Sequence, residues 1–167
     1  MTLTLILLRH AKSGWDDPAA EDHARTLTAR GQTAARRIGT WLRDQGHVPD
    51  RILTSDATRT RQTVAGVLGS LDAGPPVTQL SALYHADPGA ILRQIGKVEG
   101  AGTLLVCGHN PGIGALAQRL VTTPPDHPRF ADYPTAATTV IACDAQAWSA
   151  IRPGRCIAFV TPADLAD

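Results

Sequence analysis

The chain opens on an apolar run, residues 3–8 (LTLILL), that stops abruptly at Arg9-His10. The run is short, uncharged and aliphatic, which is typical of a buried β-strand. A second run of this kind, residues 103–107 (TLLVC), leads into Gly108-His109. Two strands that each end on a histidine can bring both imidazoles into one pocket.

Strand-like and helix-like segments alternate along the rest of the chain. We expect further strands at residues 51–54, 77–80, 138–142 and 156–161. Apolar residues recur with helical spacing at residues 27–45, 57–71 and 111–121, and another helix opens with Asp87 as N-cap and Pro88 at its first position. Residues 16–26 and 122–134 are expected to be loops. This order predicts one domain over residues 1–167, a three-layer α/β/α sandwich with a mostly parallel central sheet.

The composition is that of an ordinary globular protein, with 43% apolar residues, 19% charged residues and a net charge of +1. This balance does not favour nucleic acid as a partner. The N-terminal run is too short for a signal peptide, and no run has the length of a membrane span, so we expect a cytoplasmic protein without a membrane partner. Three cysteines without a close pair indicate a reducing compartment, and Cys107 is expected in the core rather than as a nucleophile.

Ligands of such sheets bind beyond the carboxyl ends of the strands, where Arg9-His10, residues 55–59 and residues 108–110 are all expected. A phosphoryl group carries about two negative charges, and the planar fork of arginine suits it, which makes Arg9 and Arg59 candidates. His10 is the candidate nucleophile, with its second ring nitrogen held by a backbone carbonyl. His109 would give the phosphoryl oxygens a hydrogen bond or a positive charge.

Four segments in this order resemble the histidine phosphatase superfamily: LRHAKS (residues 8–13), RTLTARG (residues 25–31), SDATRTRQT (residues 55–63) and GHNP (residues 108–111). The small size and the second segment resemble the SixA-type phosphohistidine phosphatase branch, and the resemblance spans about residues 3–125. It implies that His10 is the phosphorylated nucleophile, that Arg9, Arg59 and His109 complete the phosphate pocket, and that no metal or cofactor takes part. Three further residues are expected to bind substrate or to support the pocket: Ser13, Asn110 and Arg25.

Two residues depart from the pattern of this family. Ala11 follows the nucleophile where a glycine is common, and Ala82 stands where many members carry the glutamate that protonates the leaving group. Alkoxide leaving groups are hard to expel without such an acid, whereas a phosphoramidate releases an imidazole that is easily protonated. The sequence therefore favours P–N substrates or activated esters, unless another acid takes over, for which the candidates are Asp16, Tyr84 and Asp87.

The leading hypothesis is a cofactor-independent phosphatase that acts through a phosphohistidine on His10, with a phosphorylated protein or a small phosphorylated metabolite as its partner. Alternatives are a small-metabolite phosphomonoesterase of the same superfamily and a phosphate-binding module without turnover. A metal-dependent hydrolase using His10, His109 and Asp87 lacks paired-ligand spacing in the sequence. Three residues near the expected pocket have open roles: Lys12, Trp15 and His85.

Overall fold

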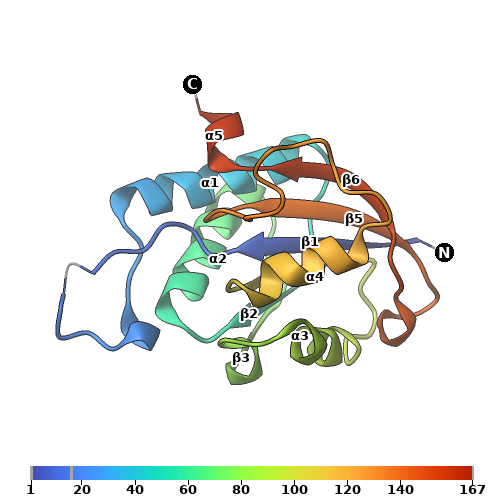
Figure 1. The fold of residues 1–167 in the computed structure, drawn as a ribbon, viewed down its shortest axis with the longest axis horizontal. Coiled ribbons are helices and arrows are strands. Elements are labelled where there is room, and N and C mark those ends of the chain that lie inside the picture. The colour runs from blue at the N-terminus through green and yellow to red at the C-terminus, as the bar shows by residue number, and fades with distance from the viewer. Residues whose placement is uncertain (1, 16, 167) are drawn as a thin grey trace.

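The computed structural model describes residues 2–15 and 17–166, and within these ranges the chain is built on a six-stranded sheet (Figure 1). The strands are β1 (Thr2–Arg9), β2 (Arg51–Ser55), β3 (Val77–Leu80), β4 (Thr103–Gly108), β5 (Thr138–Asp144) and β6 (Arg155–Val160). They lie in the order β3-β2-β4-β1-β5-β6. The first four strands pair in parallel, and β5 runs antiparallel to both of its neighbours. The predicted α/β fold with a mostly parallel sheet is confirmed.

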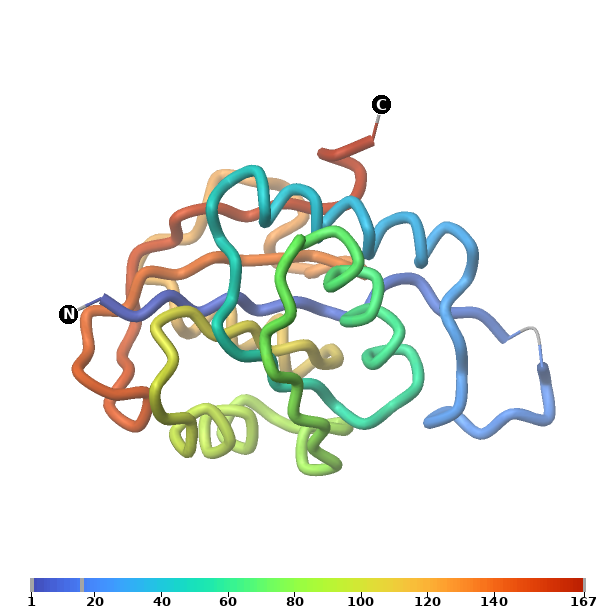
Figure 2. The backbone as a smooth tube through the Cα atoms, turned by 180° about the vertical axis from the view of Figure 1, so that it is seen from behind, coloured from blue at the N-terminus to red at the C-terminus, as the bar shows by residue number. Residues whose placement is uncertain are grey.

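Helices cover both faces of this sheet. The helices α1 (Ala29–Asp44) and α2 (Thr58–Leu71) pack on one face, seen from behind in Figure 2, and α3 (Pro88–Ile95) and α4 (Gly112–Leu120) pack on the other. A short α5 (Pro162–Leu165) lies against α1. Successive side chains of a strand point to opposite faces, so β1 sends Leu5 toward α3 and α4 and Ile6 toward α1 and α2. Burial on both faces explains why its sequence is continuously apolar.

Two of the helices, α3 and α1, begin at a side-chain cap. Asp87 caps α3 by accepting a hydrogen bond from the Ala90 N–H at 2.8 Å, with Pro88 in the first turn, as predicted. The helix expected at residues 27–45 begins at Ala29, because the Thr28 side chain accepts from the N–H of Gly31 and caps it. A Cβ atom at Gly31 would overlap the Lys12 carbonyl oxygen, so only glycine allows α1 to press against the segment after β1.

Strand register sets which residues meet at the carboxyl end of the sheet. Arg9 of β1 lies opposite Gly108 of β4, so the next residues, His10 and His109, leave the sheet side by side. The His10 N–H donates to the Gly108 carbonyl at 3.1 Å, which extends this pairing by one step. Ser55, the last residue of β2, comes to the same edge because β2 pairs with β4.

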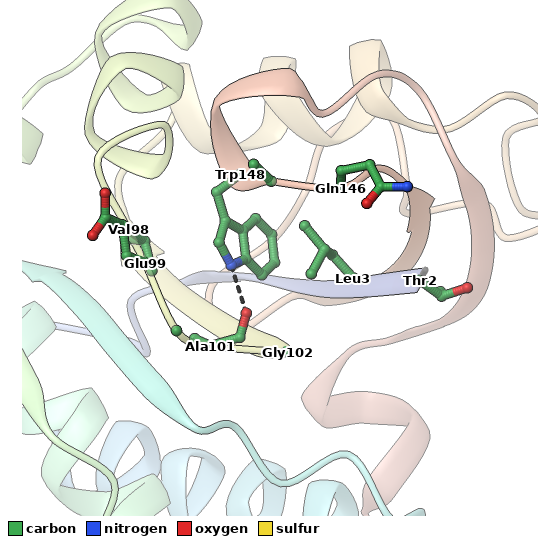
Figure 3. A pocket seen from close by; sticks show the side chains of 10 residues that line it. Thr2, Leu3, Val98, Glu99, Ala101, Gly102, Gln146 and Trp148 are labelled. Carbon is green, nitrogen blue, oxygen red and sulfur yellow. Dashed lines mark hydrogen bonds between the residues drawn. The ribbon is translucent and has the colours of Figure 1, made fainter.

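A hollow of about 460 Å³ lies at the opposite, amino end of the sheet (Figure 3). Trp148, from the short turn η3 (Trp148–Ala150), forms one side of it, and its indole N–H donates to the Ala101 carbonyl at 2.8 Å. We call it the amino-end hollow, and its lining includes Thr2, Leu3, Val98, Glu99, Ala101, Gly102, Gln146 and Trp148. Among its described lining residues, Glu99 is the only one with an ordinarily charged side chain, and none is a histidine or an arginine.

Cys107 is fully buried within β4, and burial raises the pKa of its thiol. It lies in the core as expected, where a thiol is not ionised and does not act as a nucleophile. Among the residues that the structure describes, we find no helix with both the length and the apolar character needed to span a bilayer.

Candidate active site

His10 and His109 lie together at the carboxyl end of the sheet. Their ring centroids are 5.4 Å apart, and the two residues are 7% and 4% exposed. Arg59 lies on the first turn of α2 and is 4% exposed. Its positive charge is one of the causes that lower the pKa values of both rings. Arg9 also contributes to the field at His10. The structure thus brings together the four residues that the sequence singled out, and we call them the pocket residues: Arg9, His10, Arg59 and His109.

The His10 ring is held in one tautomer. Its Nδ1 atom lies 2.7 Å from the Ala11 carbonyl oxygen, which can only accept, so Nδ1 carries a proton and Nε2 keeps a lone pair. Burial lowers the pKa of His10 to about 4, helped by Arg9 and Arg59 and partly offset by the bond to Ala11. The ring is therefore neutral near pH 7, as a nucleophilic imidazole must be.

Ser55 fixes the second ring, and the sequence did not single it out for this role. The His109 Nε2 atom lies 2.8 Å from the Ser55 hydroxyl oxygen, which already accepts a hydrogen bond from the Ala57 N–H at 3.2 Å. The hydroxyl can donate its own proton to Nε2, and in that tautomer the proton of His109 is on Nδ1. Burial, followed by the charge of Arg59, lowers the pKa of His109 to about 3, so this ring is also neutral.

Three buried nitrogen atoms of the pocket residues have no hydrogen-bond partner among the described residues: Arg9 Nε, Arg59 Nε and His109 Nδ1. Buried donors are almost always paired in proteins, because an unpaired one costs about 1–3 kcal/mol. The remaining bonds of the two arginines go elsewhere, from an Arg9 guanidinium nitrogen to the Tyr133 carbonyl at 3.1 Å and from Arg59 to Asp22. A group with several acceptor oxygens and negative charge fits these donors.

Asp22 is the main residue of the site that sequence reasoning missed. It lies on η1 (Asp22–Ala24), in a segment expected to be a loop without a pattern. Arg59 donates to its carbonyl at 2.7 Å and to its Oδ2 at 3.1 Å, Arg25 donates to its Oδ1 at 3.1 Å, and the Tyr84 hydroxyl donates to its Oδ2. The Tyr84 hydrogen bond, then Arg25 and Arg59, hold the pKa of this carboxyl well below its usual range. Asp22 is therefore ionised and holds no proton to give near pH 7.

The expected substrate-binding residues lie around the pocket residues in two groups. Arg25 donates to the Ser13 hydroxyl at 2.8 Å and stacks 3.7 Å over the ring of Trp15, which is 62% exposed. Asn110 instead turns its amide to the scaffold, donating to the Tyr133 carbonyl at 2.9 Å and accepting from the Gly114 N–H at 3.2 Å. Ser13 and Arg25 thus form the rim of the site, while Asn110 supports its floor. Lys12 is exposed.

Each of the residues considered as a general acid has a definite place, except Asp16, which lies outside the described residues. Tyr84 commits its hydroxyl to Asp22, which helps to raise the pKa of this phenol, and Asp87 caps α3. Ala82 is exposed on η2 (Ser81–Leu83). His85 reaches the site, with its ring 5.7 Å from that of His109 and its Nε2 3.4 Å from Asp22 Oδ2. Within the described ranges, no three His, Cys, Asp or Glu side chains form a group able to hold a metal ion.

The chain is similar to proteins of one family. Residues 5–91 match the family described as the Histidine phosphatase superfamily (branch 1). An uncharacterised protein of Mycobacterium tuberculosis is 38% identical over 159 residues, which cover 92% of this chain and 96% of that protein. Phosphohistidine phosphatase SixA of Escherichia coli is 30% identical over 128 residues, covering 74% and 78%. The solved structure of the protein histidine phosphatase SixA complexed with tungstate has a TM-score of 0.80 at 26% identity and covers 98% of this chain and 100% of that one.

Proposed function

The chain belongs to the histidine phosphatase superfamily, and we propose that it is a phosphatase that carries the phosphoryl group on His10. The observation that carries this proposal is the tautomer of His10. Its Nδ1–H is tied to the Ala11 carbonyl at 2.7 Å, and its lowered pKa of about 4 keeps the ring neutral, so the Nε2 lone pair is available for attack on phosphorus.

The pocket residues supply what phosphoryl transfer needs, which is positioning and charge stabilisation. In the first step His10 Nε2 bonds to phosphorus, the bond to the leaving group breaks, and its electron pair goes to the leaving atom. The unpaired N–H groups of Arg9, Arg59 and His109 are the donors for the three phosphoryl oxygens. In the second step a water molecule attacks the same phosphorus and releases phosphate and His10. The related SixA structure is complexed with tungstate, an oxyanion of comparable shape, which supports oxyanion binding as a function of this chain.

We propose phosphohistidine, or a similarly labile P–N compound, as the substrate class. Two features support it: the ionised Asp22 has no proton to give, and Ala82 has no acidic group. An alkoxide leaving group would need a proton on the bridging oxygen, whereas an imidazole leaves without one. The rim is exposed at Trp15 and His85, which suits a substrate side chain on the surface of another protein. SixA of Escherichia coli bears the name of a phosphohistidine phosphatase.

A second candidate is a phosphomonoesterase for a small metabolite, and one observation favours it. The imidazole of His85 is 59% exposed and lies beside His109, which makes it a candidate proton donor for an oxygen leaving group bound at the pocket residues. In this reading His85 replaces the carboxylic acid that Ala82 lacks.

A substrate panel separates the two candidates. We expect kcat/KM for Nε2-phosphohistidine to exceed that for glycerol phosphate or a sugar phosphate by at least about a hundredfold, the scale of one missing general acid. Activity should also survive exhaustive chelation of metal ions. Equal efficiency on alkyl phosphates, together with its loss in His85→Gln, would favour the phosphomonoesterase. Tight phosphate binding without turnover of any donor would identify a binding module instead.

A further inference from the structure

We infer that Asp22 selects a nitrogen leaving group by accepting a hydrogen bond from the ring N–H that lies opposite the P–N bond. This inference rests on the phosphatase function proposed above and assigns its leaving-group specificity to one residue. This role explains why a negatively charged carboxylate lies beside arginine residues that bind an anion.

The position of Asp22 follows from the bonds of Arg59. One terminal nitrogen of this guanidinium group donates to Asp22 Oδ2 at 3.1 Å, while its Nε–H is buried and has no partner in the described part of the chain. A phosphoryl oxygen bound at Nε would therefore have the Asp22 carboxylate on the neighbouring edge of the same group. Asp22 is also within 3.4 Å of His85, whose ring lies beside His109. The carboxylate thus stands next to the place of the phosphoryl group, on the side of the exposed rim.

The carboxylate has room for a further donor. An ionised carboxyl group offers about four acceptor positions. Oδ2 accepts from Arg59 and Tyr84, whereas Arg25 is the one donor to Oδ1 among the described residues. The Asp22 side chain is 37% exposed, so a donor can approach it from the rim. Arg25, Arg59 and Tyr84 also fix its orientation before the substrate arrives.

The chemistry of a phosphorylated imidazole explains why such an acceptor matters. If the distal ring nitrogen carries a proton, breaking the P–N bond returns its electron pair to the ring and releases neutral imidazole. If that nitrogen is bare, the same step would release an imidazolate anion, a far poorer leaving group. A carboxylate that accepts the distal N–H favours the protonated, reactive ring without transferring any proton itself. This role requires an ionised Asp22, which is the state its neighbours enforce.

The same carboxylate disfavours the competing substrates. An oxygen ester has no distal N–H to donate. A leaving group that carries its own carboxylate or phosphate would meet a like charge at Asp22, which destabilises its binding. One residue therefore raises the preference for P–N donors and lowers that for anionic metabolites.

The test is Asp22→Asn, which keeps the shape of the side chain and removes its charge. We expect the ratio of kcat/KM for Nε2-phosphohistidine to that for p-nitrophenyl phosphate to fall by about tenfold or more. The alkaline limb of kcat for phosphohistidine should also move to lower pH, because the bound ring loses its proton more easily without the carboxylate. Asp22→Glu, which restores the charge, should recover part of the ratio. Asp17→Asn is the matched control, since Asp17 is an exposed carboxylate of the same segment that accepts a hydrogen bond from the Ala19 N–H.

An unchanged ratio, or a loss by the same factor for both donors with an unmoved alkaline limb, would overturn the inference. Circular dichroism and the thermal midpoint of Asp22→Asn show whether it is folded, and Asp22→Glu serves as the deciding variant if it is not. The wild-type protein separates this result from the proposed function itself. If it hydrolyses neither donor, the proposed function fails, whereas hydrolysis of both with an unchanged ratio in the folded variant refutes only the role of Asp22.

Discussion

The two ends of the central sheet differ in chemistry. The amino-end hollow measures about 460 Å³ and is lined largely by aliphatic side chains and Trp148. The carboxyl end carries two neutral imidazoles, two guanidinium groups and three buried nitrogen atoms unpaired among the described residues. The difference teaches that a site is recognised by converging polar groups with shifted pKa values rather than by the volume of a hollow.

Arg59→Lys is expected to have the largest effect of the substitutions that probe this difference. Lysine keeps the charge but lacks the planar fork, so it cannot reproduce the geometry in which the terminal nitrogens of Arg59 bind Asp22 while its Nε–H stays free for a phosphoryl oxygen. We expect kcat/KM to fall by about 10²–10³-fold. Arg61→Lys is the matched control, because Arg61 is exposed and bonds to the Asp56 carbonyl and to Thr58. Wild-type kcat/KM in Arg59→Lys would show that the carboxyl end responds to charge alone, and an equal loss in Arg61→Lys would show that the effect is not specific to the pocket.

The neutral histidines predict a loss of stability in acid. The pKa of His10 is about 4 in the folded protein and about 6.5 in an unfolded chain, so the unfolded state binds the proton first as pH falls. The free energy of unfolding should therefore decrease between about pH 6.5 and pH 4, by roughly 3 kcal/mol from His10. His109 adds a decrease that continues to about pH 3.

Urea unfolding of the wild-type protein and of His10→Gln, in buffer without phosphate, measures this dependence. The variant should lose less stability than the wild type between pH 7 and pH 4. Parallel curves for the two proteins would mean that His10 is not kept neutral by the fold.

Ser55→Ala tests how the pocket holds its second imidazole. Without the hydroxyl, His109 Nε2 loses its partner at 2.8 Å, and the proton is no longer confined to Nδ1. We expect kcat/KM to fall by about tenfold, the lower end of the effects seen when a partner that orients a histidine is removed. Ser81→Ala, on an exposed turn, should leave it unchanged. A Ser55→Ala enzyme with wild-type kcat/KM would contradict the tautomer assigned to His109.

Trp148→Phe is expected to leave catalysis unchanged. It removes the indole hydrogen bond to the Ala101 carbonyl at 2.8 Å, so the protein should lose about 1–2 kcal/mol of stability. The values of kcat and KM should match the wild type within error. A clear change in KM would show that the amino-end hollow takes part in the reaction and would contradict the assignment of the active site to the carboxyl end alone.

The sequence predicts the sheet, and the meeting of His10 and His109 at one edge of it, because both depend on local patterns. The apolar runs before His10 and His109 define two strands, and parallel pairing then places both histidines at one edge. Asp22 could not be found in this way. It meets Arg59 across 37 positions of the chain, through a segment without periodicity, and only the path of that segment in space reveals the contact. The one local signal for a role of Asp22 is its position three residues before Arg25.

The positions of backbone carbonyl groups and the directions of side chains could not be predicted from the sequence either. The Tyr133 carbonyl accepts hydrogen bonds from both Arg9 and Asn110. The residue type at a position does not predict where its carbonyl oxygen points. This contact also explains why the amide of Asn110 faces the scaffold. Ser55 was placed at the right edge of the sheet by its strand, but its bond to His109 depends on a rotamer that the sequence does not specify.

The most direct test of the central claim is to trap the phosphorylated protein. A rapid-quench reaction with a ³²P-labelled phosphoramidate, followed by digestion at alkaline pH and mass spectrometry, should place the label on His10, and His10→Asn should show neither label nor turnover. Label on another residue, or full turnover by His10→Asn, would contradict the account.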